Sequence, residues 1–157
     1  MFHNLWVKNV LSALAVVFFG FILLNLTFLL DFLFQSLVDG AVRLFTPEDV
    51  NMAWRWFPPA KHLMFVVIIG LISWFILRSK LGTLYKAIYL TVPLAVILVS
   101  VGIFLYSWPV VPYLVGGFIT IGILYYLYRT RQPWLYYYTV VLVALTLMIF
   151  TLLGGEI

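Results

Sequence analysis

The sequence contains no cysteine, and only 9% of its 157 residues are charged. The absence of cysteine excludes disulfides, thiolate nucleophiles and cysteine metal sites. A soluble domain of ordinary composition carries about a quarter charged residues and is about half apolar. This chain is 66% hydrophobic, with a mean hydropathy of +1.16. Its composition therefore excludes an ordinary soluble domain and indicates a membrane protein.

The apolar residues form long runs that do not alternate with polar residues, as the strands of a membrane β-barrel would. A hydrocarbon core of about 30 Å takes about 20 helical residues per crossing. We therefore expect an all-α integral membrane protein, a bundle of five transmembrane helices in a single transmembrane domain over residues 1–157. The expected spans are about 9–38, 61–78, 86–108, 110–128 and 134–153.

A shorter helix is expected between the first two spans, at about 47–57. Thr46 can cap it, Pro47 suits its first position, and Glu48 with Asp49 places negative charge in its first turn, where the helix dipole is positive. Apolar and polar residues follow at helical spacing until Pro58. This pattern predicts a short amphipathic helix lying in the outer interfacial region of the membrane.

The distribution of charge predicts which side of the membrane each loop faces. With the N-terminus inside, the inner segments contain six basic residues and no acid: Lys8, Arg78, Lys80, Lys86, Arg129 and Arg131. Short loops rich in Lys and Arg stay in the cytoplasm. We expect a multi-pass protein of the cell (plasma) membrane, with a cytoplasmic N-terminus and a C-terminus outside.

Residues that could carry catalysis or hold a cofactor are scarce, since the chain has two histidines and five acids. Ser73 and His62 lie eleven residues apart on one span, about 16 Å along a helix, so they cannot pair directly. No phosphate-binding glycine loop or zinc-protease motif is present. The basic residues lie beside apolar runs, which argues against nucleic acid as a partner. We expect no catalytic set, no metal and no cofactor, and we favour a protein that is not an enzyme.

Polar residues gather near the outer end of the first two spans. Val10 to Leu30 is long enough, at about 31 Å, to place Asp31 near the outer membrane boundary. Asp31 is either part of a ligand site or a helix-end carboxylate exposed to water or paired with Arg43, Arg55 or Lys61. Likewise, His62 either joins that site or bonds locally at the interface. The candidate ligand-binding residues are Asp31, Gln35, Trp54, Trp56, Phe57 and His62.

The fourth span carries small residues that would let another helix approach closely, namely Gly116, Gly117, Thr120 and Gly122. Together with the surrounding lipid bilayer, the expected partner is a larger membrane protein or a second copy of the chain. Our first functional hypothesis is thus a non-catalytic accessory or scaffold subunit of a larger membrane complex. The alternative is a small carrier or binding protein for a lipid-like or apolar ligand with an outward-facing site. A third hypothesis, a lipid head-group enzyme, requires the outer acids Asp31, Asp39, Glu48 and Asp49 to converge with His62.

Overall fold

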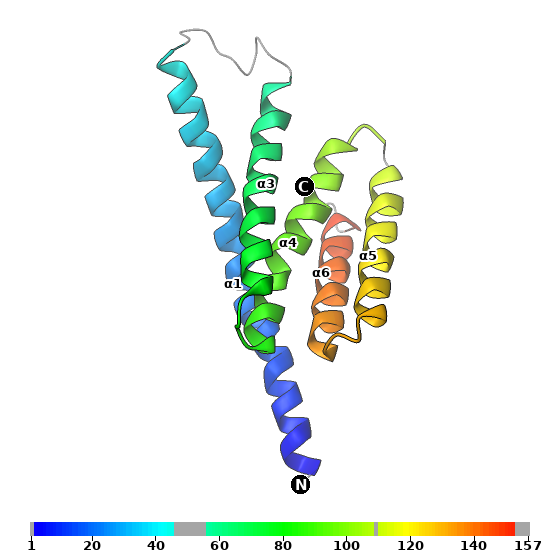
Figure 1. The fold of residues 1–157 in the computed structure, drawn as a ribbon. Helices are drawn as coiled ribbons and strands as arrows, with labels where there is room; N and C mark the ends of the chain where they lie inside the picture. Colours follow the sequence, from blue (N-terminus) through cyan, green and yellow to red (C-terminus); the bar gives the residue numbers. More distant parts are fainter. Residues whose placement is uncertain (1, 46–55, 109, 153–157) are drawn as a thin grey trace.

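The computed structural model describes residues 2–45, 56–108 and 110–152, with side chains from Asn4 onward. These residues form an all-helical bundle without strands (Figure 1). Its helices are α1 (Phe2–Arg43), α3 (Phe57–Arg78), α4 (Thr83–Phe104), α5 (Val111–Arg129) and α6 (Trp134–Leu152). The amphipathic helix expected at about 47–57 lies, up to residue 55, outside the described residues. Phe57, expected as the last residue of that helix, begins α3.

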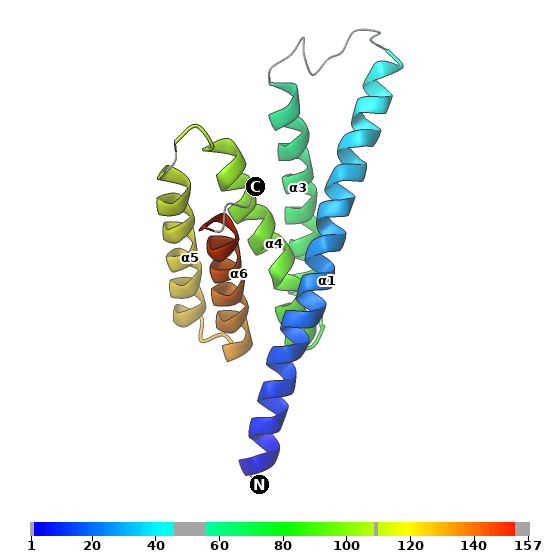
Figure 2. The same ribbon diagram turned by 180° about the vertical axis from the view of Figure 1, so that it is seen from behind.

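Each of the five helices is long and apolar enough to cross a membrane, and the shortest have 19 residues. The five candidate spans indicate a multi-pass membrane protein and confirm the predicted helical bundle. α1 differs from the others in length: its 42 residues correspond to about 63 Å. Its first turns project past the other helices in both views of the ribbon (Figures 1 and 2).

The helix ends follow from local sequence. Pro58 and Pro59 occupy the first turn of α3, and Pro112 the first turn of α5, where the missing N–H has no intrahelical partner to lose. α3 ends at Arg78, and the next residue, Ser79, is extended. Between α5 and α6, Arg131 takes a positive φ of 50°. The α3–α4 and α5–α6 connections are short, so each joins two antiparallel helices.

The bundle has a basic end and a far end. The basic end lies where α3 meets α4 and α5 meets α6, and carries Arg78, Lys80, Lys86, Arg129 and Arg131. The far end lies where α1 finishes, α3 begins, α4 finishes and α5 begins. The polar residues that form the candidate site lie toward the far end.

α4 is the central helix, because α1, α3, α5 and α6 all pack against it. Half of its most apolar stretch is buried, compared with 6% for α5, which lies at the side of the bundle against α4 and α6 (Figure 1). Buried apolar residues form three clusters along α4. One of them separates the candidate site from the basic end and consists of Phe65, Ile69, Val92 and Val96.

Two close contacts fix α4 against its neighbours. Gly20 of α1 is buried beside Thr91, and a Cβ added at Gly20 would lie 2.8 Å from the Thr91 Cγ2 atom. The Thr139 hydroxyl of α6, which is fully buried, donates to the carbonyl of Ala87 at 3.2 Å as well as to that of Leu135 at 2.9 Å. The lack of a side chain at Gly20 therefore lets α1 approach α4 closely, and the hydrogen bond from Thr139 links α6 to α4.

Candidate functional site

The α3–α4 hairpin brings polar side chains opposite one another at two levels. His62 lies 19 positions before Leu81 in the turn, and Ser100 lies 19 positions after it. In the same way, Ser73 and Tyr89 each lie eight positions from Leu81. Two antiparallel helices joined by a short turn pair residues at equal distances from that turn. His62 accordingly meets Ser100, and the Ser73 hydroxyl meets the Tyr89 hydroxyl at 3.2 Å.

Asp31, Gln35, His62 and Ser100 form one connected group between three helices, which we call the polar cluster. The His62 Nε2 atom lies 2.9 Å from the Ser100 Oγ atom. On the other side of the ring, His62 Nδ1 lies 3.7 Å from Asp31 Oδ2, and Gln35 Nε2 donates to the same oxygen at 3.0 Å. The side chains of His62 and Asp31 are only 10% and 17% exposed. The imidazole thus bridges α1 to α4 across the start of α3.

The second carboxylate oxygen of Asp31 has no partner in the cluster. Asp31 Oδ1 is buried, and no group among the described residues donates a hydrogen bond to it. A buried acceptor left without a donor costs free energy, and a charged one costs more. A group that donates a hydrogen bond to Oδ1 would remove this cost.

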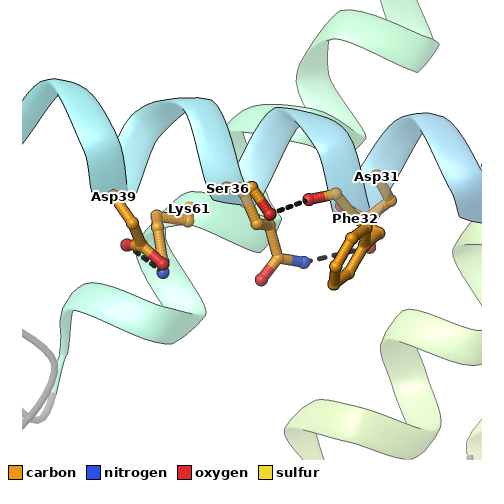
Figure 3. Close-up of polar contacts among 6 residues, drawn as sticks. Asp31, Phe32, Ser36, Asp39 and Lys61 are labelled. Carbon is orange, nitrogen blue, oxygen red and sulfur yellow. Dashed lines mark hydrogen bonds and ion pairs between the residues drawn. The ribbon is translucent and has the colours of Figure 1, made fainter.

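A half-buried ion pair lies beside the polar cluster, further toward the far end. The Lys61 Nζ atom lies 2.6 Å from Asp39 Oδ1, and the Lys61 side chain is only 5% exposed (Figure 3). Nζ also lies 5.1 Å from the centre of the Phe57 ring. Asp31 and Asp39 project from α1 in the same view, two turns apart. Lys61 therefore pairs with Asp39, while Asp31 turns to His62.

The described geometry does not suit acyl transfer, although an acid, a histidine and a serine stand in line. The Ser100 hydroxyl donates to the Val96 carbonyl at 2.6 Å, so its proton is directed along α4 rather than toward His62. Ser100 is also 7% exposed and lies within a helix, where the backbone N–H groups are used by the helix. A serine nucleophile needs a base to accept its proton and free donors for the oxyanion.

Nor do the polar residues of α3 and α4 form a continuous path between the two ends. The apolar cluster of Phe65, Ile69, Val92 and Val96 lies between the polar cluster and the Ser73–Tyr89 pair. All four of these residues are at most 7% exposed. A proton relay requires successive groups that exchange protons, and hydrocarbon side chains interrupt it here.

The structure brings three of the six candidate ligand-binding residues together, namely Asp31, Gln35 and His62. Trp56 and Phe57 lie at the start of α3 with their rings 6.2 Å apart and nearly perpendicular, and Trp56 is 62% exposed. Trp54 lies outside the described residues. His62 meets residues of other helices rather than bonding only within α3, because the hairpin buries its ring against Ser100. Ser100 was missed, and equal spacing about Leu81 is the signal that identifies it.

The acids that a lipid head-group enzyme would need at the far end are not brought together among the described residues. Asp31 meets His62, whereas Asp39 is held by Lys61. Glu48 and Asp49 fall within residues 46–55, which the structure does not describe. Among the described residues, no group of three or more His, Asp or Glu side chains could hold a metal ion.

The candidate helix-packing residues of α5 divide between two directions. A Cβ at Gly116 would contact Leu98 of α4 at 3.6 Å, whereas nothing described lies within 4 Å of one at Gly117 or Gly122. The Thr120 hydroxyl donates to the Gly116 carbonyl at 2.8 Å. Gly116 thus faces the bundle, while Gly117 and Gly122 lie where a further helix has room to approach.

The fold and the cluster define a multi-pass helical membrane protein with a buried polar group between α1, α3 and α4. Comparison with protein-family models, curated proteins and solved structures finds no match. The function must therefore be inferred from the residues themselves.

Proposed function

We propose that this chain is a plasma-membrane protein that binds a lipid-like ligand at the polar cluster. The observation that carries the proposal is the buried Asp31 Oδ1 atom, which lacks a donor among the described residues. Ionisable groups inside a membrane bundle are costly and commonly mark a functional site. The unsatisfied oxygen also indicates the kind of ligand, since a group that donates to it would form a charge-assisted hydrogen bond.

In this proposal the basic end faces the cytoplasm and the far end faces outward, because Lys and Arg concentrate in cytoplasmic loops. Ser100 lies 14 residues from Lys86 along α4, which is about 21 Å. The cluster then lies in the outer half of a core about 30 Å thick.

The natural absence of cysteine allows a direct check of this orientation by labelling introduced cysteines. On intact cells, an impermeant maleimide should label Ser107→Cys at the far end and leave Thr130→Cys at the basic end unlabelled; the reverse pattern would exclude this orientation.

The polar and apolar surroundings of Asp31 define the ligand class. Its head must donate an N–H or O–H to a carboxylate, and its body must be apolar enough to reach a site inside the bilayer. A lipid with a primary ammonium head meets both requirements, whereas a quaternary ammonium head cannot donate.

We expect Asp31→Asn to abolish selective retention of such a lipid. The substitution preserves side-chain size and removes the charge, so it weakens a charge-assisted hydrogen bond that is about twice as strong as a neutral one. The measurement is native mass spectrometry of the full chain with phosphatidylethanolamine and with phosphatidylcholine of the same acyl chains. Wild type should retain the ethanolamine lipid at least about tenfold better, in line with a contribution of about 1.5–3 kcal/mol, and Asp31→Asn should retain the two lipids equally.

Asp39→Asn provides the matched control, because Asp39 is an acid on the same helix but is already paired with Lys61. It should keep the lipid preference of the wild type. Equal retention of the two lipids by the wild type, or equal loss in both variants, would contradict a ligand site at Asp31.

A second function, accessory subunit of a larger membrane assembly, is favoured by the exposed glycines of α5. Gly117 and Gly122 have room beside them, and α5 is the least buried of the described helices. Small residues let helices approach closely enough for backbone contact and van der Waals packing. The partner in this proposal is another membrane helix, from a second copy or from a larger protein.

We expect Gly117→Leu with Gly122→Leu to dissociate that assembly without unfolding the chain, because a Cβ added at either position has no described neighbour within 4 Å. The mass of the particle in mild detergent should fall to that of the 18.1 kDa chain. Gly70→Leu on α3 is the control, since it too has nothing described within 4 Å, and it should leave the mass unchanged. A wild-type chain that is already a stable monomer would contradict this function.

A further inference from the structure

A second lipid-facing feature lies at the opposite end of the molecule, where the first turns of α1 pass the start of α4. There, an open groove of about 770 Å³ runs between α1 and Leu84. This volume is within the range of small-molecule sites, which is about 300–1,000 Å³. The groove does not involve the polar cluster, because its lining comes from the first turns of α1 and from Leu84 at the start of α4. The first turns of α1 project past the other helices (Figure 2).

The lining of the groove is amphiphilic. Leu5, Leu11 and Leu84 contribute apolar surface, and most of the lining is of this kind. Asn4, Lys8 and Ser12 recur every four residues and share one face of α1. Their amide, ammonium and hydroxyl groups can all donate hydrogen bonds. Within the described part of the chain, none of these three side chains has a hydrogen-bond or ion-pair partner of its own.

The basic end carries positive charge that would attract an anion. Lys8 lies at the groove, and Arg78, Lys80, Lys86, Arg129 and Arg131 lie at the same end of the bundle without any acid among the described residues there. Each basic residue near an anionic membrane surface adds to the attraction for acidic head groups. Lys86 is engaged with the Leu77 carbonyl at 2.8 Å, and Arg78 lies 3.7 Å from the centre of the Trp74 ring. Lys8 is therefore the cation placed to act in the groove itself.

We propose that this groove binds one phospholipid with an anionic head group. The Lys8 ammonium pairs with the phosphate. The Asn4 amide and the Ser12 hydroxyl, which lie about 12 Å apart along α1, donate to other oxygens of the same lipid on either side of the phosphate, and an acyl chain lies along Leu5, Leu11 and Leu84. The bound lipid fills the angle between the projecting turns of α1 and the start of α4. This site is independent of the ligand proposed at Asp31, since the two differ in residues, in head-group charge and in their end of the bundle.

The test is native mass spectrometry of the full chain after reconstitution with phosphatidylglycerol, with phosphatidylcholine of the same acyl chains, or with inorganic phosphate. Wild type should retain one phosphatidylglycerol in preference to phosphatidylcholine and should not retain phosphate. Lys8→Gln should lower that retention by about fivefold, the size expected for one basic residue at a membrane surface. Lys80→Gln removes a charge at the same end but outside the groove, and should lower it much less.

A second variant tests the apolar part of the groove. Leu84→Trp fills the space beside α1 and should lower retention of phosphatidylglycerol while leaving Lys8 in place. Equal effects of Lys8→Gln and Lys80→Gln would show diffuse attraction rather than a site and would overturn the proposal. It would also be overturned by equal retention of phosphatidylcholine, by retention of free phosphate, or by a Leu84→Trp variant that behaves as wild type.

Discussion

Gly20→Ala is expected to lower the free energy of unfolding by about 1–3 kcal/mol, the usual cost of adding a methyl group to a packed interior. The added Cβ would lie 2.8 Å from the Thr91 Cγ2 atom, a separation that side-chain carbons do not adopt. Thr91 cannot turn away at little cost, because it is β-branched, is 3% exposed, and donates its hydroxyl to the Ile88 carbonyl at 2.8 Å. α1 must then move away from α4. Unfolding in mixed micelles of sodium dodecyl sulfate and dodecyl maltoside measures the change.

Thr91→Ser supplies the compensating variant, because it removes Cγ2 and keeps the hydroxyl bond. Alone it should cost about 0.5–1.5 kcal/mol, as a small methyl deletion does. Combined with Gly20→Ala it should restore most of the lost stability, giving a coupling of more than about 1 kcal/mol between the two sites. Gly70→Ala, which meets nothing described within 4 Å, should be neutral or slightly stabilising. Additive effects of Gly20→Ala and Thr91→Ser would show that α1 and α4 do not meet at this point.

The sequence is sufficient to predict the helices because their signals are local. Length, hydropathy and the placement of Pro58, Pro112 and the basic turns each act within a few residues. The interior of the bundle is less predictable from those signals, because it depends on which helix lies against which. Gly20 illustrates the difference: it lies within an apolar run and has no distinctive local pattern, yet a Cβ at this position would collide with Thr91 of α4.

The candidate site was predictable in part for the same reason. Asp31, Gln35 and Asp39 share a stripe on one helix, which helical periodicity reveals. The division of partners, Asp31 with His62 and Asp39 with Lys61, depends on the depth at which α3 passes α1. Ser100 is intermediate in how well the sequence predicts it. It has no distinctive local pattern, but the hairpin turn at Leu81 is visible in the sequence and pairs Ser100 with His62.

His62→Leu is expected to lower the free energy of unfolding by about 3 kcal/mol, because it leaves the Asp31 carboxylate facing an apolar side chain. The carboxylate is 17% exposed and keeps only the Gln35 amide as a donor. In the wild type, Asp31→Asn should also destabilise, by about 1–2 kcal/mol, because the imidazole loses its charged partner. Both values follow from unfolding in the same mixed micelles.

The combination of these two variants decides whether Asp31 and His62 act as a pair. In the His62→Leu background, Asp31→Asn should be stabilising, because a buried neutral amide costs less free energy than a buried carboxylate that has lost its imidazole neighbour. The sign of the Asp31→Asn effect therefore reverses between the two backgrounds. Ser100→Ala is the matched control: it removes a neutral hydroxyl on the other side of the ring, costs about 0.6 kcal/mol as membrane-buried hydrogen bonds do on average, and should leave the sign of the Asp31→Asn effect unchanged. If Asp31→Asn destabilised both backgrounds equally, the 3.7 Å contact between Asp31 and His62 would contribute nothing, and the carboxylate would be held by Gln35 alone.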